Sequence, residues 1–213
     1  MINPLIKRKI LLLAPHTDDI ELGCGGSVAK WVEDGHEIKY VAFSDCNESL
    51  PEGFEKGTLK KEMEKATGIL GIPMSNVQLF DMPVRKFLEH RQEILDILIV
   101  LRSEFKPDIV LIPSQNDIHQ DHQVITNEAL RAFKHCTIFG YELPWNQLKT
   151  NNNGFVSLKA THVDKKVSSI SAYSSQQAKS YAKEEYIRAL ALTRGIQINH
   201  EFAEAFEIIR AII

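Results

Sequence analysis

Runs of apolar residues alternate with amphipathic segments along most of the chain. The run 9–15 is continuously apolar, as expected for a strand that is covered on both faces. Similar runs predict further strands, and apolar residues spaced three or four positions apart predict helices between them. The expected strands are 9–15, 37–44, 76–80, 108–113 and 137–143, and the expected helices are 23–34, 58–70, 87–105, 121–134 and 165–192.

The order of these elements predicts the fold class. Strands that alternate with helices at this spacing form right-handed β-α-β units. We therefore expect a Rossmann-like α/β fold, with a doubly wound, mostly parallel sheet and helices on both faces. The sequence has no internal repeat and no long linker, so residues 1–213 are expected to form a single domain.

Two segments in the second half of the chain are less clearly patterned. Residues 146–154 are polar, and we predict a surface loop there. Residues 202–213 are rich in apolar side chains, but their periodicity fits a last strand and a helix equally well. If this segment is not a core strand, its apolar side chains need cover, so we expect a homo-oligomer.

Composition excludes several classes of protein. The chain has 25 Lys and Arg against 28 Asp and Glu, and this slightly acidic balance argues against a nucleic-acid partner. No stretch approaches the roughly 20 apolar residues of a membrane helix, so we expect no membrane span. The three cysteines (Cys24, Cys46 and Cys136) are widely spaced and contain no CxxC pair, which disfavours both a disulfide framework and a cysteine zinc site. A cytoplasmic location is the resulting expectation.

Candidate chemistry lies after two of the expected strands. Ligands of doubly wound sheets bind outside the carboxyl ends of the strands. Acids and histidines follow the strands 9–15 and 108–113, and they would share one cleft if these strands are neighbours. The residues concerned are His16, Asp18, Asp19, His119, Asp121 and His122.

These residue types suit a hydrolytic metal site. Two histidines and one carboxylate, with a coordination position left open, are a common ligand set for catalytic zinc, and other divalent transition metals also accept histidine nitrogen. The remaining groups would supply a general base, an acid or oxyanion stabiliser, and a carboxylate that orients a histidine. As an alternative, the two acids could cap a helix and the second group could be a solvated turn. Residues 23–26 are rich in glycine, but they lack the spacing of a dinucleotide fingerprint.

At these residues the chain resembles the PIG-L/LmbE-like family of metal-dependent de-N-acetylases. That family has a His-Pro-Asp-Asp motif after its first strand, and residues 16–19 here read His-Thr-Asp-Asp. Its later His-x-Asp-His motif is matched in full by residues 119–122. The similarity continues through 165–176, where Tyr173 replaces a common histidine, to an Arg-Gly pair at 194–195 and Ala-Glu-Ala-Phe at 203–206.

The resemblance implies a role for each of these side chains. The implied ligands of a zinc ion are His16, Asp19 and His122. Asp18 is implied as the general base, and His119 as the acid or oxyanion stabiliser, oriented by Asp121. Arg85 and Asn47 are further candidates for substrate contacts, whereas the arginine that family members often carry after the second strand has only Lys60 and Lys61 near its place.

The implied function is that of a zinc-dependent hydrolase. It would remove the N-acetyl group from an amino sugar or an N-acetylglucosamine conjugate, so the expected partner is a small N-acetylated sugar. Two alternatives stay open at this point. One is a metal hydrolase of the same fold that acts on another acylated amine or an ester, and the other is a non-catalytic module that binds a nucleotide or a sugar.

Overall fold

The computed structural model describes residues 7–212, and these contain one seven-stranded sheet. The strand order is β3-β2-β1-β4-β5-β7-β6, in which β1 to β5 are parallel and β7 runs antiparallel to both of its neighbours. The strands are β1 (Lys9–Ala14), β2 (Glu37–Ala42), β3 (Val77–Leu79), β4 (Ile109–Pro113), β5 (Thr137–Tyr141), β6 (Gly154–Leu158) and β7 (Phe202–Arg210).

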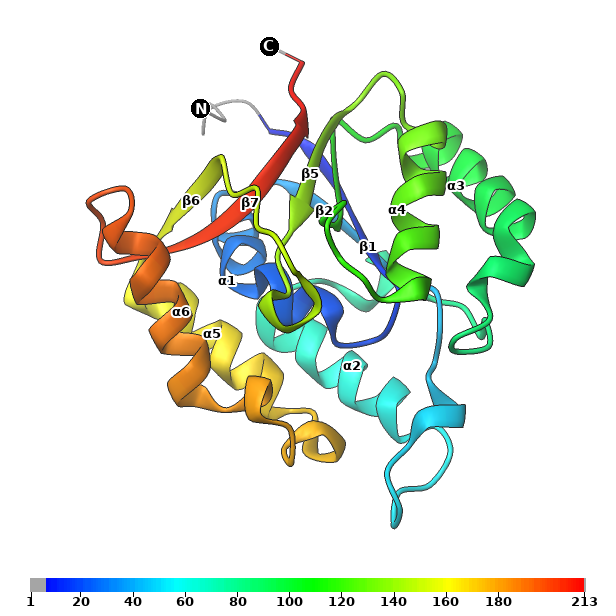
Figure 1. Ribbon diagram of the computed structural model, residues 1–213, viewed down its shortest axis with the longest axis horizontal. Coiled ribbons are helices and arrows are strands. Elements are labelled where there is room, and N and C mark those ends of the chain that lie inside the picture. Colours follow the sequence, from blue (N-terminus) through cyan, green and yellow to red (C-terminus); the bar gives the residue numbers. More distant parts are fainter. Residues whose placement is uncertain (1–6, 213) are drawn as a thin grey trace.

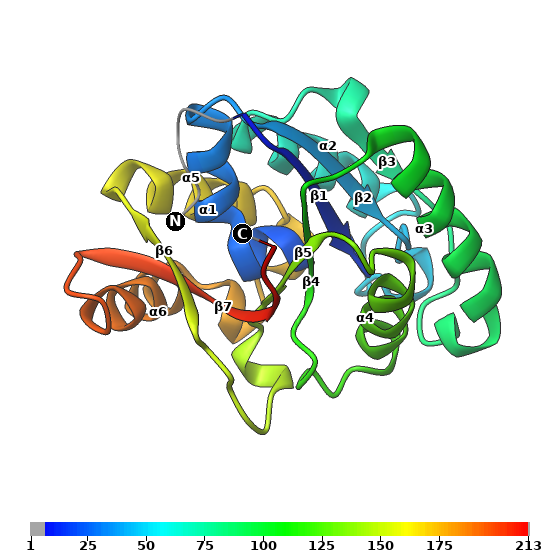
Figure 2. The same ribbon diagram turned by 90° about the horizontal axis from the view of Figure 1, so that it is seen from above.

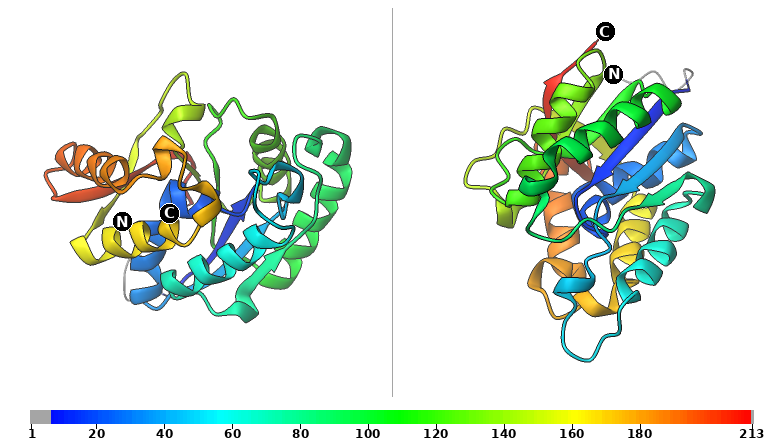
Figure 3. Two further views of the ribbon diagram at one scale, coloured as in Figure 1. Left: turned by 90° about the horizontal axis from the view of Figure 1, so that it is seen from below. Right: turned by 90° about the vertical axis from the view of Figure 1, so that its right-hand side faces the viewer.

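Helices cover both faces of this sheet, which confirms the predicted doubly wound α/β class. Figures 1 and 2 show α3 and α4 on one face, and α1, α2, α5 and α6 on the other. Seen from below, α2 lies beside α5, and the two helices pack together (Figure 3). The helices are α1 (Asp19–Glu33), α2 (Thr58–Leu70), α3 (Arg91–Phe105), α4 (Gln120–Ala132), α5 (Ala160–Ser171) and α6 (Glu184–Ile196). No helix in the described part of the chain is both long and apolar enough to cross a membrane.

The continuous apolar run of β1 is explained by two separate cores. Successive side chains of a strand point to opposite faces of the sheet. Ile10 and Leu12 therefore belong to the core beneath α1 and α2, whereas Leu11 and Leu13 belong to the core beneath α3 and α4. All four are fully buried, so a strand in the middle of this sheet has no solvent-facing side.

The neighbours of β1 decide where a ligand can bind. β1 pairs with β2 on one side and with β4 on the other, with Ile10 opposite Ile109 in the β4 pairing. The chain runs from β1 toward one edge of the sheet and from β4 toward the other, so the two strands flank the topological switch point. The two polar groups at their carboxyl ends therefore meet, as the sequence predicts.

Helix α1 differs from the prediction at its start. It begins at Asp19, four residues before the expected start at Gly23, and its backbone leaves helical geometry at Cys24 (φ −147°, ψ 24°). The backbone N–H groups of Gly26 and Ser27 donate to the carboxylate of Glu204, at 3.0 and 2.6 Å. This carboxylate supplies partners for N–H groups that the kink leaves without helical acceptors.

The glycines of residues 23–26 allow close packing. A Cβ atom on Gly23 would lie 2.4 Å from the ring of Tyr141, and one on Gly26 would lie 2.6 Å from Leu158. Side chains at these positions would push α1 away from the sheet. Because α1 begins at Asp19, the last residue of the His-Thr-Asp-Asp motif, this packing holds the motif at the end of β1.

The C-terminal third departs furthest from the prediction. Residues 154–158 form β6, a strand that the sequence pattern does not predict. The expected helix 165–192 is two helices, α5 and α6, separated by short 3-10 turns. The segment 202–213 is resolved in favour of a strand, because Phe202–Arg210 forms β7 between β5 and β6, and residue 213 lies outside the described residues. Residues 203–207 are buried within the sheet, whereas Ile208 and Ile212 are exposed. The oligomeric state stays a prediction.

Candidate metal centre

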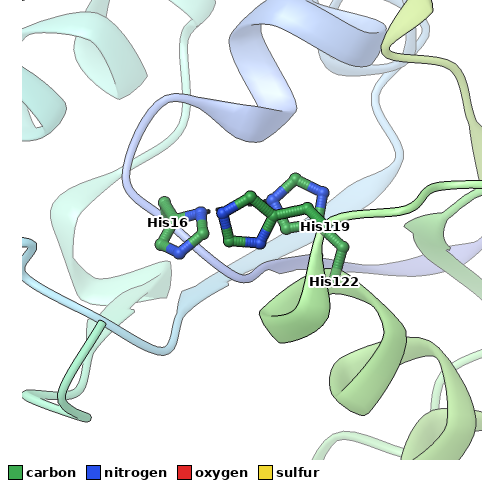
Figure 4. Close-up of side chains that lie close together, drawn as sticks. All are labelled: His16, His119 and His122. Atoms are coloured by element: carbon green, nitrogen blue, oxygen red, sulfur yellow. Dashed lines mark hydrogen bonds between the residues drawn. The ribbon is translucent and has the colours of Figure 1, made fainter. Parts of the chain in front are cut away.

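Two loops bring three imidazole rings together at the switch point. His16 lies in the loop after β1, His119 immediately precedes α4, and His122 lies in the first turn of α4. Figure 4 shows the three rings turned toward one another. One nitrogen from each ring lies within 4.8 Å of the others, a spacing that could hold a metal ion.

A carboxylate completes a tight triangle with two of these rings. His16 Nδ1 lies 3.2 Å from His122 Nε2, and Asp19 Oδ2 lies 3.3 Å from each of these two nitrogens. A tetrahedron with zinc–ligand distances of about 2.0–2.1 Å has edges of about 3.3–3.4 Å between ligand atoms. The three atoms therefore fit one face of such a tetrahedron, and the residues present suit a single divalent ion.

Two further carboxylates hold the rings from behind. Asp117 Oδ2 lies 2.8 Å from His122 Nδ1, and Asp121 Oδ2 lies 3.1 Å from His16 Nε2. Each carboxylate can accept the proton of the outer nitrogen, which leaves the inner nitrogen free to bind a metal. The sequence pattern assigns no role to Asp117, which lies two residues before His119 in the loop after β4.

The orientation of His119 differs from what the resemblance implies. The carboxylate of Asp121 contacts His16 and the backbone N–H groups of Arg85 (2.6 Å) and Phe87 (3.4 Å). Among residues 7–212, the His119 side chain has one hydrogen bond, in which the backbone N–H of Asp121 donates to its Nδ1 at 3.2 Å. The reason is geometric: both residues lie at the start of α4, where the side chain at 121 turns back toward β1 and away from the ring at 119.

The pKa values of the cluster indicate a place for positive charge. Burial lowers the pKa of His122, but the charge of Asp19 and hydrogen bonds with Asp117 and Asp19 outweigh it and raise this pKa to about 10. Burial raises the pKa of Asp19, but the charge and hydrogen bond of His122 hold it well below its ordinary value. A divalent ion would take the place of the proton that this arrangement holds.

Asp18 and His119 differ from the triangle in their protonation. Burial, and then the charge of Asp19, raise the pKa of Asp18, which makes its carboxylate a stronger base. Burial, and then the charges of His122 and His16, lower the pKa of His119 to about 4. A neutral His119 whose Nδ1 accepts a hydrogen bond carries its proton on Nε2, so this nitrogen is a donor.

These groups open into a cavity of about 530 Å³. Arg85 lines it, as do Trp145, Lys179 and Tyr181. Asn47 is not among the lining residues, because its side chain bonds to Asp45 and to the backbone N–H of Gly57 (2.7 Å) within its own loop. The neighbouring Cys46 and Ser49 line the cavity instead.

A larger hollow of about 820 Å³ lies around the opposite ends of the strands. Its charged residues pair with one another, because Arg8 lies 3.6 Å from Asp108 and Lys30 lies 3.0 Å from Asp34. The cavity at the histidine cluster is therefore the candidate active site, although it is the smaller of the two.

The doubly wound sheet and the His-His-Asp triangle, with a second carboxylate beside it, suit a hydrolytic enzyme with a site for a divalent metal. A family model described as PIG-L, GlcNAc-PI de-N-acetylase, matches residues 11–133, which is more than half of the chain. The chain belongs to this family. It is an enzyme of the deacetylase class, hydrolases that act on carbon–nitrogen bonds other than peptide bonds.

Individual relatives are distant in sequence. The chain is 27% identical to the uncharacterized deacetylase YaiS of Escherichia coli K12, over 79% of this chain and 92% of that protein. It is 23% identical to the diacetylchitobiose deacetylase of Thermococcus kodakarensis, over 96% and 84%. The solved structure of GalB, a 4-carboxy-2-hydroxymuconate hydratase from Pseudomonas putida KT2440, has a TM-score of 0.79 at 21% identity, over 97% and 98%. At this identity the likeness shows the fold alone.

Proposed function

We propose that this protein is a zinc-dependent N-deacetylase that removes the acetyl group from an amino sugar or an N-acetylglucosamine conjugate. The triangle of His16 Nδ1, Asp19 Oδ2 and His122 Nε2 carries the proposal, because its edges of 3.2–3.3 Å fit a tetrahedral ion. Two imidazole nitrogens favour zinc or another divalent transition metal over magnesium or calcium, which prefer oxygen ligands. Bound there, the ion would polarise the acyl carbonyl and lower the pKa of water.

In this proposal Asp18 is the general base. It adjoins Asp19 but lies outside the triangle and lines the same cavity. Its carboxylate takes a proton from the attacking water as the oxygen bonds to the acyl carbon. It then delivers that proton to the amine nitrogen as the carbon–nitrogen bond breaks, so acetate and a free amine leave. A raised pKa suits both steps, because the group must accept a proton and return it at neutral pH.

We assign the oxyanion to His119. Its Nδ1 is held by the backbone N–H of Asp121 at 3.2 Å, which leaves the proton on Nε2, and one of its ring nitrogens lies within 4.8 Å of nitrogens of His16 and His122. A neutral donor of fixed orientation stabilises negative charge as it develops on the carbonyl oxygen. Asp121 and Asp117 act through His16 and His122, which they hold in the tautomers that bind metal.

The relatives support the substrate class. The family description names GlcNAc-PI, and one relative is named for diacetylchitobiose, so both descriptions point to N-acetylated glucosamine units. GalB shares the fold and is described as a hydratase, so the fold by itself does not select a reaction. The donor triangle together with Asp18 and His119 is what favours amide hydrolysis for this chain.

The test is acetate release by the purified enzyme, first stripped of metal and then reloaded with zinc. We expect zinc-dependent release from N-acetylglucosamine conjugates and none from the metal-free protein. A panel of other N-acyl and O-acyl compounds, with the same readout, defines the substrate class. Full zinc occupancy without hydrolysis of any acetylated sugar would refute the proposal, and a preference for esters would replace it with an esterase.

The place of action is also part of the proposal. All three cysteines are buried and free, which supports a reducing compartment such as the cytoplasm. Fractionation of cells that express the untagged protein tests this. Recovery with secreted or membrane material would contradict it.

A further inference from the structure

One glutamine in the wall of the cavity has an acceptor atom that no described residue uses. Gln176 lies in a 3-10 turn between α5 and α6 and lines the cavity of the histidine cluster, although only 5% of its surface is exposed. Among residues 7–212 its side chain makes one hydrogen bond, in which Nε2 donates to Ser175 Oγ at 3.0 Å. Its Oε1 is not among the unpartnered polar atoms that protein encloses completely. This oxygen therefore reaches open space, and the cavity is the space that Gln176 lines.

The neighbours of Gln176 fix which end of its amide is the oxygen. The nitrogen and oxygen of a glutamine amide exchange places when the group turns over, so its hydrogen-bond partners decide between them. Ser175 Oγ lies 2.5 Å from Glu62 Oε2. A hydroxyl has one proton to donate, and a carboxylate takes it because it can only accept. Ser175 Oγ must then accept from Gln176, so the atom beside it is Nε2 and the remaining end is Oε1.

Glu62 also holds the whole turn in place. This residue of α2 is almost fully buried, and its Oε1 accepts the backbone N–H of Ser175 at 3.0 Å and the hydroxyl of Ser174 at 2.6 Å. Three hydrogen bonds to one buried carboxylate therefore fasten the turn to α2. Hydrogen bonds to a charged group are stronger than those between neutral groups, so this mount is rigid.

The turn of Gln176 packs close to the reacting groups. Tyr173, three residues earlier, donates its hydroxyl to the carbonyl of Thr17, which lies between His16 and Asp18 in the metal-site loop. Both Thr17 and Asp18 line the same cavity as Gln176. A substrate whose acyl group lies at the metal centre therefore fills a space that has the Gln176 acceptor in its wall.

We propose that Gln176 is a specificity-determining residue whose carbonyl oxygen accepts a hydrogen bond from a donor on the substrate. The donor is either the N–H of the scissile amide or a hydroxyl of the attached sugar. This inference rests on the proposed deacetylase function and adds a substrate contact to it. A ligand without the donor is disfavoured, because it leaves a nearly buried acceptor unpaired. Glu62 is a positioning residue, since it acts through Ser175.

The experiment removes the donor and the acceptor separately and then together. The parent sugar is the methyl glycoside of N-acetylglucosamine, and its analogues are the 3-, 4- and 6-deoxy forms and the 2-O-acetyl sugar, in which oxygen replaces the N–H. The kcat/KM of each is measured with the zinc-loaded wild-type enzyme and with Gln176→Met. The variant should lose about 3- to 10-fold on the parent, the worth of a neutral hydrogen bond. On the analogue that lacks the donor, both enzymes should react equally well. That analogue identifies the donor as the N–H or as one hydroxyl.

Two further variants separate this contact from a structural effect. Gln177→Met removes a neighbouring amide that does not line the cavity and that donates to the backbone carbonyls of Ile170 at 3.1 Å and Tyr173 at 3.3 Å. Any change that it causes should be the same factor for every sugar. Ser175→Ala leaves Gln176 in place but removes the group that orients its amide, so the discrimination between parent and analogue should weaken. Circular dichroism and bound zinc establish that each variant is folded and loaded.

Failure of this inference is distinguishable from failure of the deacetylase function. Calorimetry of the same sugars with zinc-loaded Asp18→Asn and Asp18→Asn/Gln176→Met measures binding without turnover. If Gln176→Met lowers kcat/KM by one common factor for all sugars, or for none, the inference is overturned even though acetate is released. If no sugar is hydrolysed but one analogue loses the effect of Gln176→Met on binding, the contact stands and the reaction is wrong. A parent sugar that neither reacts nor binds overturns both.

Discussion

The affinity of this centre for zinc should rise with pH, because the neighbours of His122 raise the pKa of its ring. In the metal-free protein the pKa of His122 is raised to about 10, because its contacts with Asp19 and Asp117 outweigh burial. The ring therefore carries two protons at pH 8. A metal needs the lone pair of Nε2, so one proton must leave His122 for each ion that binds.

The size of the effect follows from that pKa. At pH 8, two units below 10, only about 1% of His122 is neutral, and the apparent affinity should rise about tenfold per pH unit until the pH approaches 10. An unperturbed histidine, with a pKa near 6.5, is already neutral at pH 8 and would give a nearly flat dependence. Asp19 contributes no proton, because its pKa is held well below its ordinary value.

The assay is zinc titration of the metal-free protein from pH 7 to 9, in competition with a chromophoric chelator. Calorimetry in two buffers of different ionisation enthalpy then counts the protons released. Water on the bound ion also loses a proton in this range, so a control is needed. Asp117→Asn removes one of the groups that raise the pKa of His122 and leaves the water contribution in place, so its proton count at pH 8 should be lower.

Stability gives a second readout of the same shift. The folded-state pKa of His122 lies above the unfolded value of 6.5. The protonated ring therefore adds to the free energy of unfolding in full below pH 6.5, and this added stability is lost as the pH rises through about 10. The melting temperature of the metal-free protein should fall across that window, and less so in Asp117→Asn. An affinity that does not change between pH 7 and 9, with equal proton counts in both proteins, would refute the reasoning.

Four substitutions, and a fifth as a control, test the remaining roles. Asp18→Asn should keep zinc and lose about 10²–10⁴ in kcat, whereas Asp19→Ala should lose zinc; the opposite pattern in metal analysis and kinetics would exchange the two roles. His119→Ala should keep zinc and lose about 10²–10³ in kcat, and a loss of metal instead would make it a ligand. Tyr173→Phe removes a hydroxyl that donates to the carbonyl of Thr17, in the loop between His16 and Asp19, so it should weaken zinc binding. The control Tyr141→Phe removes a buried hydroxyl that donates to the carbonyl of Leu13 in β1, and it should weaken zinc binding less. Equal zinc affinity in both variants would show that the first hydroxyl is not needed.

Elements with strong local signals could be predicted from the sequence. The helix expected at 58–70 has those bounds in the structure, because apolar spacing marks its face and Gly71 ends it with φ of +89°. The two polar groups could also be placed, because each follows a continuous apolar run and the carboxyl ends of parallel strands share one edge of the sheet. Local pattern therefore carried both the fold class and the position of the site.

Features that depend on distant contacts could not be predicted. The early start and kink of α1 rely on Glu204, which is 178 residues from Gly26 along the chain. The glycines of residues 23–26, taken by themselves, predict that a helix cannot continue through them. The carboxylate of Glu204 makes it possible for helix to continue on both sides of the kink. Strand β6 escaped prediction for a similar reason, since this short segment is defined by its pairing with β7.

The same limit applies inside the site. The sequence shows that acids accompany the histidines but not which acid meets which ring. Asp121 reaches His16, 105 residues away, although His119 is its neighbour in sequence. Asp117, in the loop before α4, contacts His122 in the first turn of that helix. Which carboxylate contacts which ring depends on how the histidine rings are oriented. That orientation depends on the placement of β1 beside β4.

Two departures from the family pattern meet at one atom. Residue 17 is threonine where the family has proline, and residue 173 is tyrosine where a histidine is common. The carbonyl of Thr17 accepts the hydroxyl groups of both Tyr173 and Tyr40, the latter at 2.7 Å, and all three residues are fully or almost fully buried. A proline ring would restrict this loop through its own φ angle, whereas threonine leaves the backbone freer. The two buried donors on its carbonyl supply a restriction from outside the loop, so Tyr173 and Tyr40 help to keep Asp18 and Asp19 in place.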